Sequence, residues 1–432
     1  MMEVLYGIID SIVLIIRYVW WLILPLFLFP IFWNLRMRYI RTRYVKSIEW
    51  LMLEVKIPKD ILKTPKAMEQ VFSEMAAIYS FGMKPVDIYL NGKVEPWISF
   101  EMAGHAGGVN FYIYTPSKYR NLIESAIYAQ YPEAEIHQAE DYTELFGNTL
   151  PNKIYDVFGA EFGLLKESYY PIRTYQYFEE PTEERRLDPI AAISEVMSNL
   201  KEGEAIWLQT LISPTGAPSG NDWQAEGIEK INEITGKKTE KEKKKGLGGA
   251  LYEWIRNLFF APVKYPDWPA LAKKEEAAVS KFLNPHEQEI VKAISNKISK
   301  FGFETVIRFV YIDRRDSFTP SNPIAVIGSF QQFGISHLNA FKPKVAAKGG
   351  WLAHFFPKYK ELTEFALKKE IFQKYRERRF GAYNKTKPEK FSVLNTEELA
   401  TVYHFPAIMV KAPRLRRVEA KKVGPPSGLP IE

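Results

Sequence analysis

Arginine and lysine side chains that could bind phosphate are concentrated in the last third of the chain. Between Lys342 and Lys390 they alternate with phenylalanine and tyrosine, and a second basic group follows Lys411. Basic groups contact nucleic-acid phosphates and aromatic rings stack on bases, so this pattern is typical of nucleic-acid contact. The residues singled out for contact with nucleic acid or a protein partner are Arg376, Arg378, Arg379, Arg414, Arg416 and Arg417. We expect the first three at the surface.

Two other interpretations of this region are open. Four glutamates between Glu361 and Glu377 neutralise part of the positive charge, which is typical of a solvated helix. The C-terminal sequence PPSGLP is typical of linkers and docking peptides, because proline favours an extended backbone. The basic segments can therefore bind DNA, dock a protein partner or only face solvent.

Motifs for catalysis and for cofactors are absent from the sequence. There is no cysteine, which excludes thiolate metal sites and cysteine nucleophiles. The pair His286-Glu287 begins an HExxH zinc pattern, but Ile290 stands at its last position. No Walker A loop and no GxSxG nucleophile elbow occurs. We therefore expect no enzyme activity, no catalytic residue, no metal and no cofactor.

The first apolar segment runs from Ile12 to Trp33 and contains one charged residue, Arg17. A helix needs about 20 apolar residues to cross a bilayer, so we predict a transmembrane anchor over residues 1–35. The side chains expected at the membrane interface are Trp20, Trp21, Trp33, Arg36, Arg38, Arg41 and Arg43. Because basic residues follow the apolar run, the positive-inside rule predicts a single-pass inner-membrane protein with its bulk in the cytoplasm.

The rest of the 432 residues alternates between strand and helix patterns, which predicts an α+β fold. Residues 47–145 show the order β-α-β-β-α-β of a ferredoxin-like module. The same order recurs over residues 155–345, interrupted by a helical insertion at 214–300. A basic helical region at 346–410 and a proline-rich basic tail at 411–432 complete the predicted organisation.

Four of the predicted helices have the same start signal. A good N-cap residue is followed by proline, which suits the first helical position because its missing N–H needs no partner there. The four pairs are Thr64-Pro65, Thr115-Pro116, Asp188-Pro189 and Asn322-Pro323.

Several segments resemble the membrane-anchored N-terminal region of conjugative-transfer ATPases of the type IV secretion class, which are related to the FtsK/HerA motors. The resemblance rests on SIEWLMLEVKIPKDILKTPKAMEQVF, on YAQYP in the second predicted helix and on TEELATVYHFP at Thr396 to Pro406. In that family a RecA-like motor follows the PP-x-x-LP region, whereas this chain contains no Walker A motif.

The resemblance implies a membrane-anchored scaffold or docking subunit of a conjugation or type IV secretion-like translocation machine. The partners that it implies are the membrane, a separate FtsK/HerA-type ATPase, DNA and further copies of the chain in a homo-oligomer. The alternative is a membrane-anchored nucleic-acid-binding protein without a motor partner, for which salt-sensitive DNA retention is expected.

Overall fold

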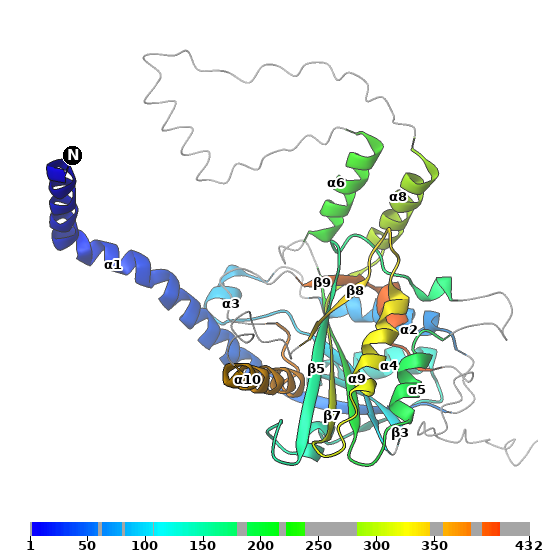
Figure 1. Ribbon diagram of the computed structural model, residues 1–432. Helices are drawn as coiled ribbons and strands as arrows, with labels where there is room; N and C mark the ends of the chain where they lie inside the picture. The colour runs from blue at the N-terminus through cyan, green and yellow to red at the C-terminus, as the bar shows by residue number, and fades with distance from the viewer. Residues whose placement is uncertain are drawn as a thin grey trace, which may run out of the picture. The chain divides into compact units, whose positions relative to one another are not determined.

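Figure 1 shows the protein as a computed structural model. The structure describes residues 2–58, 63–79, 83–106, 108–178, 188–215, 222–237, 283–345, 357–381 and 391–406. The chain separates into two compact units. Met1–Asp222 and Lys300–Glu432 form the larger unit, and Trp223–Ser299 form the smaller one.

A single antiparallel sheet organises the larger unit. The strands of its described part are β1 (Trp50–Lys56), β2 (Ile98–His105), β3 (Gly108–Pro116), β4 (Glu135–Gln138), β5 (Tyr155–Leu164), β6 (Ala205–Pro214), β7 (Gly302–Arg314), β8 (Phe341–Val345) and β9 (Ser392–Asn395). Eight of these nine strands follow the order β4-β1-β3-β2-β6-β7-β5-β8, and β9 pairs with β7.

The sheet has two halves of the same design. Strands β1 and β2 flank β3 in the first half, and β5 and β6 flank β7 in the second. Helices α2 (Pro65–Met75) and α4 (Arg120–Gln130) connect strands of the first half, while α5 (Ala191–Ser198) and α9 (Ser321–Ser329) do so in the second. Each crossover skips one strand, as in a split βαβ unit.

The two halves join along one pair of strands. Strand β2 pairs with β6 from Ile98 opposite Ile212 to His105 opposite Ala205. All ten residues of β6 are buried, as expected for a strand that is covered on both faces and both edges. The sequence pattern predicts two successive modules, whereas the structure merges them in one sheet.

Several helices of the larger unit cover one face of this sheet (Figure 1). Helices α2, α4, α5 and α9, together with α11 (Thr396–Val402), bury a large apolar core against it. A smaller core lies on the opposite face beneath helix α10 (Pro357–Arg376) and includes Trp207, Phe372 and Tyr375. Alternate residues of each strand therefore enter two different cores.

The N-terminal apolar segment belongs to the long helix α1 (Met2–Ser47), with Pro25 and Pro30 inside it. Among the described residues, no helix combines the length and the apolar character that a membrane span requires. The predicted fold class with a transmembrane anchor at 1–35 and the predicted single-pass inner-membrane location are therefore wrong. The helix does not end with the apolar segment but continues through the basic stretch that follows it, to Ser47.

The smaller unit contains helices α6 (Trp223–Thr235) and α8 (Pro285–Ile298), which contact each other. Asn284 caps α8: its side chain accepts from the Glu287 N–H, and the Glu287 carboxylate accepts from the Asn284 N–H. This capping box satisfies two N–H groups at the start of the helix.

Short helical segments complete the described structure. They are α3 (Pro85–Tyr89), η1 (Ala76–Ile78), η2 (Ser117–Tyr119), η3 (Tyr142–Phe146), η4 (Tyr175–Tyr177) and η7 (Phe330–Phe333). Segment η3 carries Tyr142 to the face of the sheet that α10 covers, where this ring joins the smaller core.

Candidate functional site: the C-terminal basic segment

Helix α10, which carries many of the basic residues, packs closely on the sheet. Ile371, Phe372 and Tyr375 are buried, and the ring centres of the latter two lie 6.4 and 5.8 Å from that of Trp207. Gly159 of β5 permits the close approach, because a Cβ atom there would lie 2.9 Å from the Ile371 side chain. The inner face of α10 is therefore a structural surface.

A row of polar side chains crosses the sheet beneath the C-terminal end of α10. The consecutive cross-strand partners in this row are Tyr112, Glu101, Gln209, Arg308 and Glu161. Glu101 and Gln209 are fully buried, and Arg308 is 2% exposed. Buried charged and amide groups need hydrogen-bond partners, because an unpaired one costs several kcal/mol.

Arg308 and Gln209 find their partners at the end of α10. The Arg308 Nη1 and Nη2 atoms donate to the carbonyls of Lys374 and Arg379, each at 2.9 Å. The Gln209 amide donates to the Tyr375 carbonyl at 3.0 Å. The Lys374 and Tyr375 carbonyls also accept from the N–H groups of Arg379 and Arg378. The Arg308 guanidinium places positive charge at the negative end of the helix. Burial lowers the pKa of Arg308, although Glu161 opposes this effect.

Arg378 lies in the centre of the same network. Its Nε donates to Glu101 at 3.0 Å, and its Nη2 donates to Asp141 at 2.9 Å. The guanidinium also lies over the ring of Tyr114, 4.5 Å from its centre. Burial favours the neutral form of Arg378, but Glu101 and Asp141 outweigh it and raise the pKa well above its ordinary value. The residue adopts φ 45°, the left-handed conformation common just after a helix end.

Two tyrosines complete the network. Tyr142 donates to Glu101 at 2.7 Å, and its oxygen lies 2.7 Å from that of Tyr375. Burial, with the nearby Glu101 carboxylate, raises the pKa of both phenols well above the ordinary value. Glu101 thus joins α10, η3 and the centre of the sheet.

The other arginines singled out from the sequence have different surroundings. Arg376 is partly exposed and donates to the carbonyl and the side chain of Asn148 at 3.0 and 2.7 Å. Arg379 pairs with Glu377 and is 37% exposed. Arg414, Arg416, Arg417 and the predicted tail at 411–432 lie outside the described residues. The structure therefore places one of the three described arginines, Arg378, in the interior.

The residues predicted for the membrane interface lie along α1. Arg36 donates to the Tyr89 carbonyl at 2.9 Å and lies over the ring of Trp33. Arg38 and Arg43 are exposed, and Arg41 is half-buried. Trp21 is exposed and donates to the Tyr18 carbonyl, while the side chain of Trp20 lies outside the described ones. Arg36 thus contacts the α3 segment.

The segment after β9 is buried, as the apolar residues Leu399, Val402, Tyr403 and Phe405 at helical spacing indicate. Asn395 and Glu398 form a capping box at the start of α11, and six of the seven α11 residues are buried. The Lys300 amine lies 2.6 Å from both Glu69 of α2 and Glu397 of α11. The ring of His404 contacts the Ala400 carbonyl at 2.8 Å and the Asp188 carboxylate at 2.9 Å. The chain is therefore held in place up to Phe405.

The described residues contain no group of three His, Cys, Asp or Glu side chains that could hold a metal ion. The ionisable residues of this site pair with one another across the sheet. The arrangement can fix a segment and present it to a partner, and the described residues of the network offer no nucleophile–base pair.

Fold and site define an α+β protein with one antiparallel sheet of two similar halves, whose C-terminal segment is held by buried ion pairs. A family model described as a domain of unknown function (DUF8128) matches residues 46–416, which include every strand of the sheet. The chain belongs to this family. No curated protein matches the chain.

Proposed function

We propose that the protein is a docking subunit that positions an FtsK/HerA-type ATPase in a conjugation or type IV secretion-like translocation machine. The observation that carries the proposal is the burial of β9, α11 and the residues up to Phe405. In the conjugative-transfer ATPases that the chain resembles, this stretch is the one that leads toward the motor.

A fixed attachment point favours docking for a thermodynamic reason. Binding costs free energy whenever it orders a mobile group, so a partner-binding segment that starts from a rigid base has less freedom to lose. Leu399, Tyr403 and Phe405 are at most 2% exposed, and the ring of Phe405 packs edge-on against Phe111 and Tyr131. The basic residues that come next in the sequence therefore start from a fixed point of the fold.

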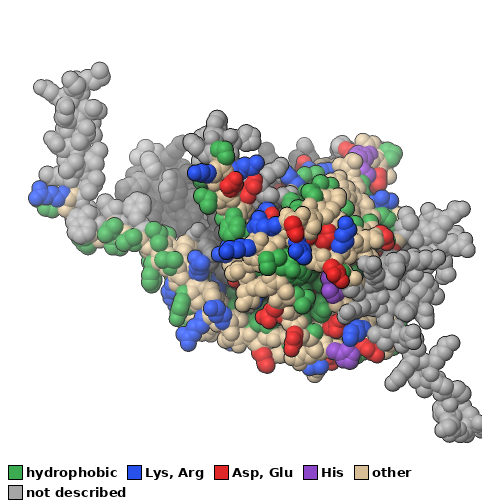
Figure 2. Space-filling model, turned by 60° about the horizontal axis from the view of Figure 1, so that its bottom comes forward, with side chains coloured by type: hydrophobic (Ala, Val, Ile, Leu, Met, Phe, Trp, Pro, Cys, Tyr) green, Lys and Arg blue, Asp and Glu red, His purple; other side chains and the backbone are tan. Residues whose placement is uncertain are grey.

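The pairing of charges on α10 favours docking over nucleic-acid binding. Three lysines of the helix have carboxylate neighbours: Lys360 with Glu364, Lys368 with Asp156 and Lys374 with Glu370. Figure 2 shows acidic and basic side chains interspersed over the face that it presents. A DNA-binding surface collects positive charge on one face, because phosphate contacts dominate its affinity.

The proposal is tested by co-purification with an FtsK/HerA-type ATPase from the same source. A chain truncated before Lys411 should lose the ATPase, and so should a variant with Arg414, Arg416 and Arg417 changed to Glu. A matched control replaces three described, exposed basic residues, Arg38, Arg43 and Lys358, by Glu and should retain it. Unchanged melting temperatures would show that the fold survives.

DNA retention, measured at several salt concentrations, separates the two functions. If the tail variants keep the ATPase but lose DNA in a salt-dependent way, the protein is a nucleic-acid-binding protein and the docking proposal fails. If the tail variants retain both the ATPase and DNA, the docking function and the nucleic-acid-binding function are both wrong.

Self-association is the second partner interaction that we propose. Tyr359, Leu362 and Phe365 on α10 expose between 45% and 70% of their surface and follow one another at helical spacing. Light scattering at rising concentration should show copies associating, and Leu362→Lys should weaken this association. A constant monomer mass would contradict it.

A further inference from the structure

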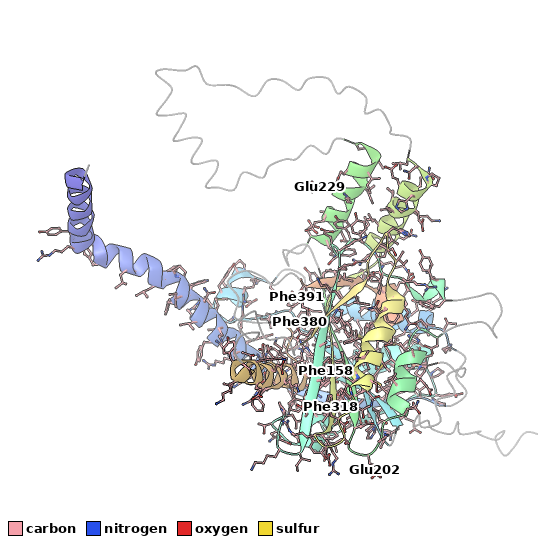
Figure 3. All side chains as sticks on the ribbon, viewed as in Figure 1. Phe158, Glu202, Glu229, Phe318, Phe380 and Phe391 are labelled. Carbon is pink, nitrogen blue, oxygen red and sulfur yellow. The ribbon has the colours of Figure 1, made fainter. Side chains whose placement is uncertain are left out.

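A pocket of about 300 Å³ opens on the same face of the sheet as α10, near the β2–β3 turn. Its aromatic wall consists of Tyr112, Tyr142, Phe146, Tyr155 and Trp207. Figure 3 labels Glu202, another lining residue, at the lower edge of the molecule, far from Phe380 and Phe391 in that view. The volume is at the lower end of the range of about 300–1,000 Å³ for small-molecule pockets.

The aromatic wall is rigid because its rings pack on one another. The ring centres of Tyr112 and Tyr142 are 4.7 Å apart and stacked, and Tyr142 meets Trp207 edge-on at 5.2 Å. Phe146 meets Trp207 and Tyr155 at 5.7 and 5.0 Å. A rigid wall preserves its shape when the pocket is empty, so a ligand does not need to order it.

Apart from His105, the lining residues with acidic or basic side chains are glutamates. Among the thirteen described residues that line it there are two glutamates, Glu202 and Glu204, and no lysine or arginine. Arg314, which lies next to Gly203, forms an ion pair with Asp316 at 3.3 Å. In a chain with a net charge of +7, this pocket is a local site of negative charge.

The two glutamates lie in the turn before β6 and have different surroundings. The N–H of Glu204 donates to the Lys201 carbonyl, and Gly203 has φ 89°, which closes a tight turn. Glu204 is buried and accepts hydrogen bonds from the Lys201 N–H at 2.7 Å and the Tyr311 hydroxyl at 3.1 Å. Tyr311 belongs to the larger core, so the Glu204 carboxylate lies on the opposite face of the sheet from the aromatic wall. Glu202 is exposed at the tip of the turn, so its carboxylate is accessible to a ligand.

His105 also lines the pocket. Its Nδ1 lies 2.9 Å from the Gly108 carbonyl oxygen. A carbonyl oxygen can only accept, so Nδ1 carries a proton and donates it to this bond. The pocket therefore combines aromatic rings with the Glu202 carboxylate at its rim, and both favour a positively charged ligand.

We propose that this pocket binds a small organic cation of the ammonium class. Aromatic faces attract such cations through the ring quadrupole, most strongly for Trp, and sites for quaternary ammonium groups are built from aromatic rings. Glu202 at the rim adds Coulomb attraction. The proposal does not depend on the docking function, because the pocket lies at the β2–β3 turn and contains none of the C-terminal residues.

Choline and its neutral isostere, 3,3-dimethyl-1-butanol, test the proposal with the full-length protein. The two molecules share their shape and differ in the charge of one atom. Saturation-transfer NMR on their methyl protons should show choline binding at least about threefold more tightly, since cation–π attraction accounts for that ratio or more. Equal binding of both would show an apolar pocket and overturn the proposal, as would the absence of choline binding.

Two variants test whether choline binds in this pocket. Glu202→Gln should weaken choline binding about two- to fivefold, as for an exposed ion pair, whereas Glu133→Gln at another exposed position should not. Phe146→Leu keeps an apolar side chain but removes a ring, and it should also weaken choline binding. If Glu133→Gln weakens binding as much as Glu202→Gln, the attraction is to the whole protein, and the proposal is wrong.

Discussion

Neighbouring arginines of one basic run have opposite roles in this protein. Arg378 is 2% exposed and is paired with two carboxylates, while Arg379 lies partly in solvent beside Glu377. An ion pair that is removed from water is costly to break, because the remaining carboxylate stays buried without its partner. An exposed pair contributes little, because water and salt screen it.

Arg378→Ala should therefore lower the free energy of unfolding by about 3–5 kcal/mol, the range for breaking a buried pair. Arg379→Ala should change it by less than about 0.5 kcal/mol. Urea unfolding followed by circular dichroism measures both. Equal effects would mean that the Glu101–Arg378 pair does not support the fold.

Asp141 should make stability depend on pH. Burial opposes its charged form, but the bond from Arg378 outweighs this effect and lowers the pKa of Asp141 below 3.8. A lowered native pKa means that the carboxylate's contribution is complete above the unfolded value and is lost as the pH falls through the native one. Asp141→Asn should be less stable at pH 7, and the difference from the wild type should shrink below pH 3.8. A difference that is constant from pH 7 to pH 2 would contradict this.

At the scale of elements, α10 depends on a glycine for its close contact with β5. A Cβ at Gly159 would lie within 3.1 Å of the Ile371 side chain and the Phe309 carbonyl, whereas one at Gly163 of the same strand would meet only the Ser392 hydroxyl, at 3.9 Å. Contacts near 3 Å force neighbouring atoms to move, which costs free energy in a packed core.

Gly159→Ala should destabilise the protein by about 1–3 kcal/mol and increase amide hydrogen exchange in α10. Gly163→Ala is the matched control, and it should leave stability the same or slightly higher, because alanine has less backbone freedom to lose. Equal stability of the two variants would show that α10 can move away from the sheet without cost.

At the scale of the whole molecule, the residues of the smaller unit are inserted in the sequence between β6 and β7, two strands that pair with each other. Pro214 of β6 pairs with Phe303 of β7, and the Thr215 N–H donates to the Gly302 carbonyl at 3.0 Å. The chain therefore leaves and re-enters the sheet at nearly the same place, as at the end of a β-hairpin. An insertion at such a position adds little loop-closure cost to the sheet.

Replacing residues 223–299 by a six-residue Gly-Ser linker should leave the larger unit folded. Its strand content should persist, and its melting temperature should change by only a few degrees, since Lys300 and its bonds to Glu69 and Glu397 are retained. Circular dichroism and thermal denaturation test this. Loss of the folded state would show that the larger unit requires the smaller one.

Local sequence signals identified the order of strands and helices, because they depend on residues close in the chain. Thr64 is the N-cap of α2, as its pair with Pro65 predicts. At Pro116 the strand β3 ends and the helix α4 begins only at Arg120, because pairing with Trp50 extends the strand. The helix predicted from Pro189 starts at Ala191, and the one predicted from Pro323 starts at Ser321.

Only the tertiary structure decided which of the polar and basic residues are buried and which are exposed. Glu101, Gln209 and Arg308 lie in three different strands, and only the alignment of β2, β6 and β7 brings them together. Arg378 has no local signal that separates it from Arg379, because its partners Glu101 and Asp141 lie more than 230 residues earlier in the sequence. The sequence by itself was enough to establish the composition, the absence of catalytic and nucleotide-binding motifs, and the positions of most strands and helices. The fold determined burial and pairing, since both depend on contacts between residues far apart in the chain.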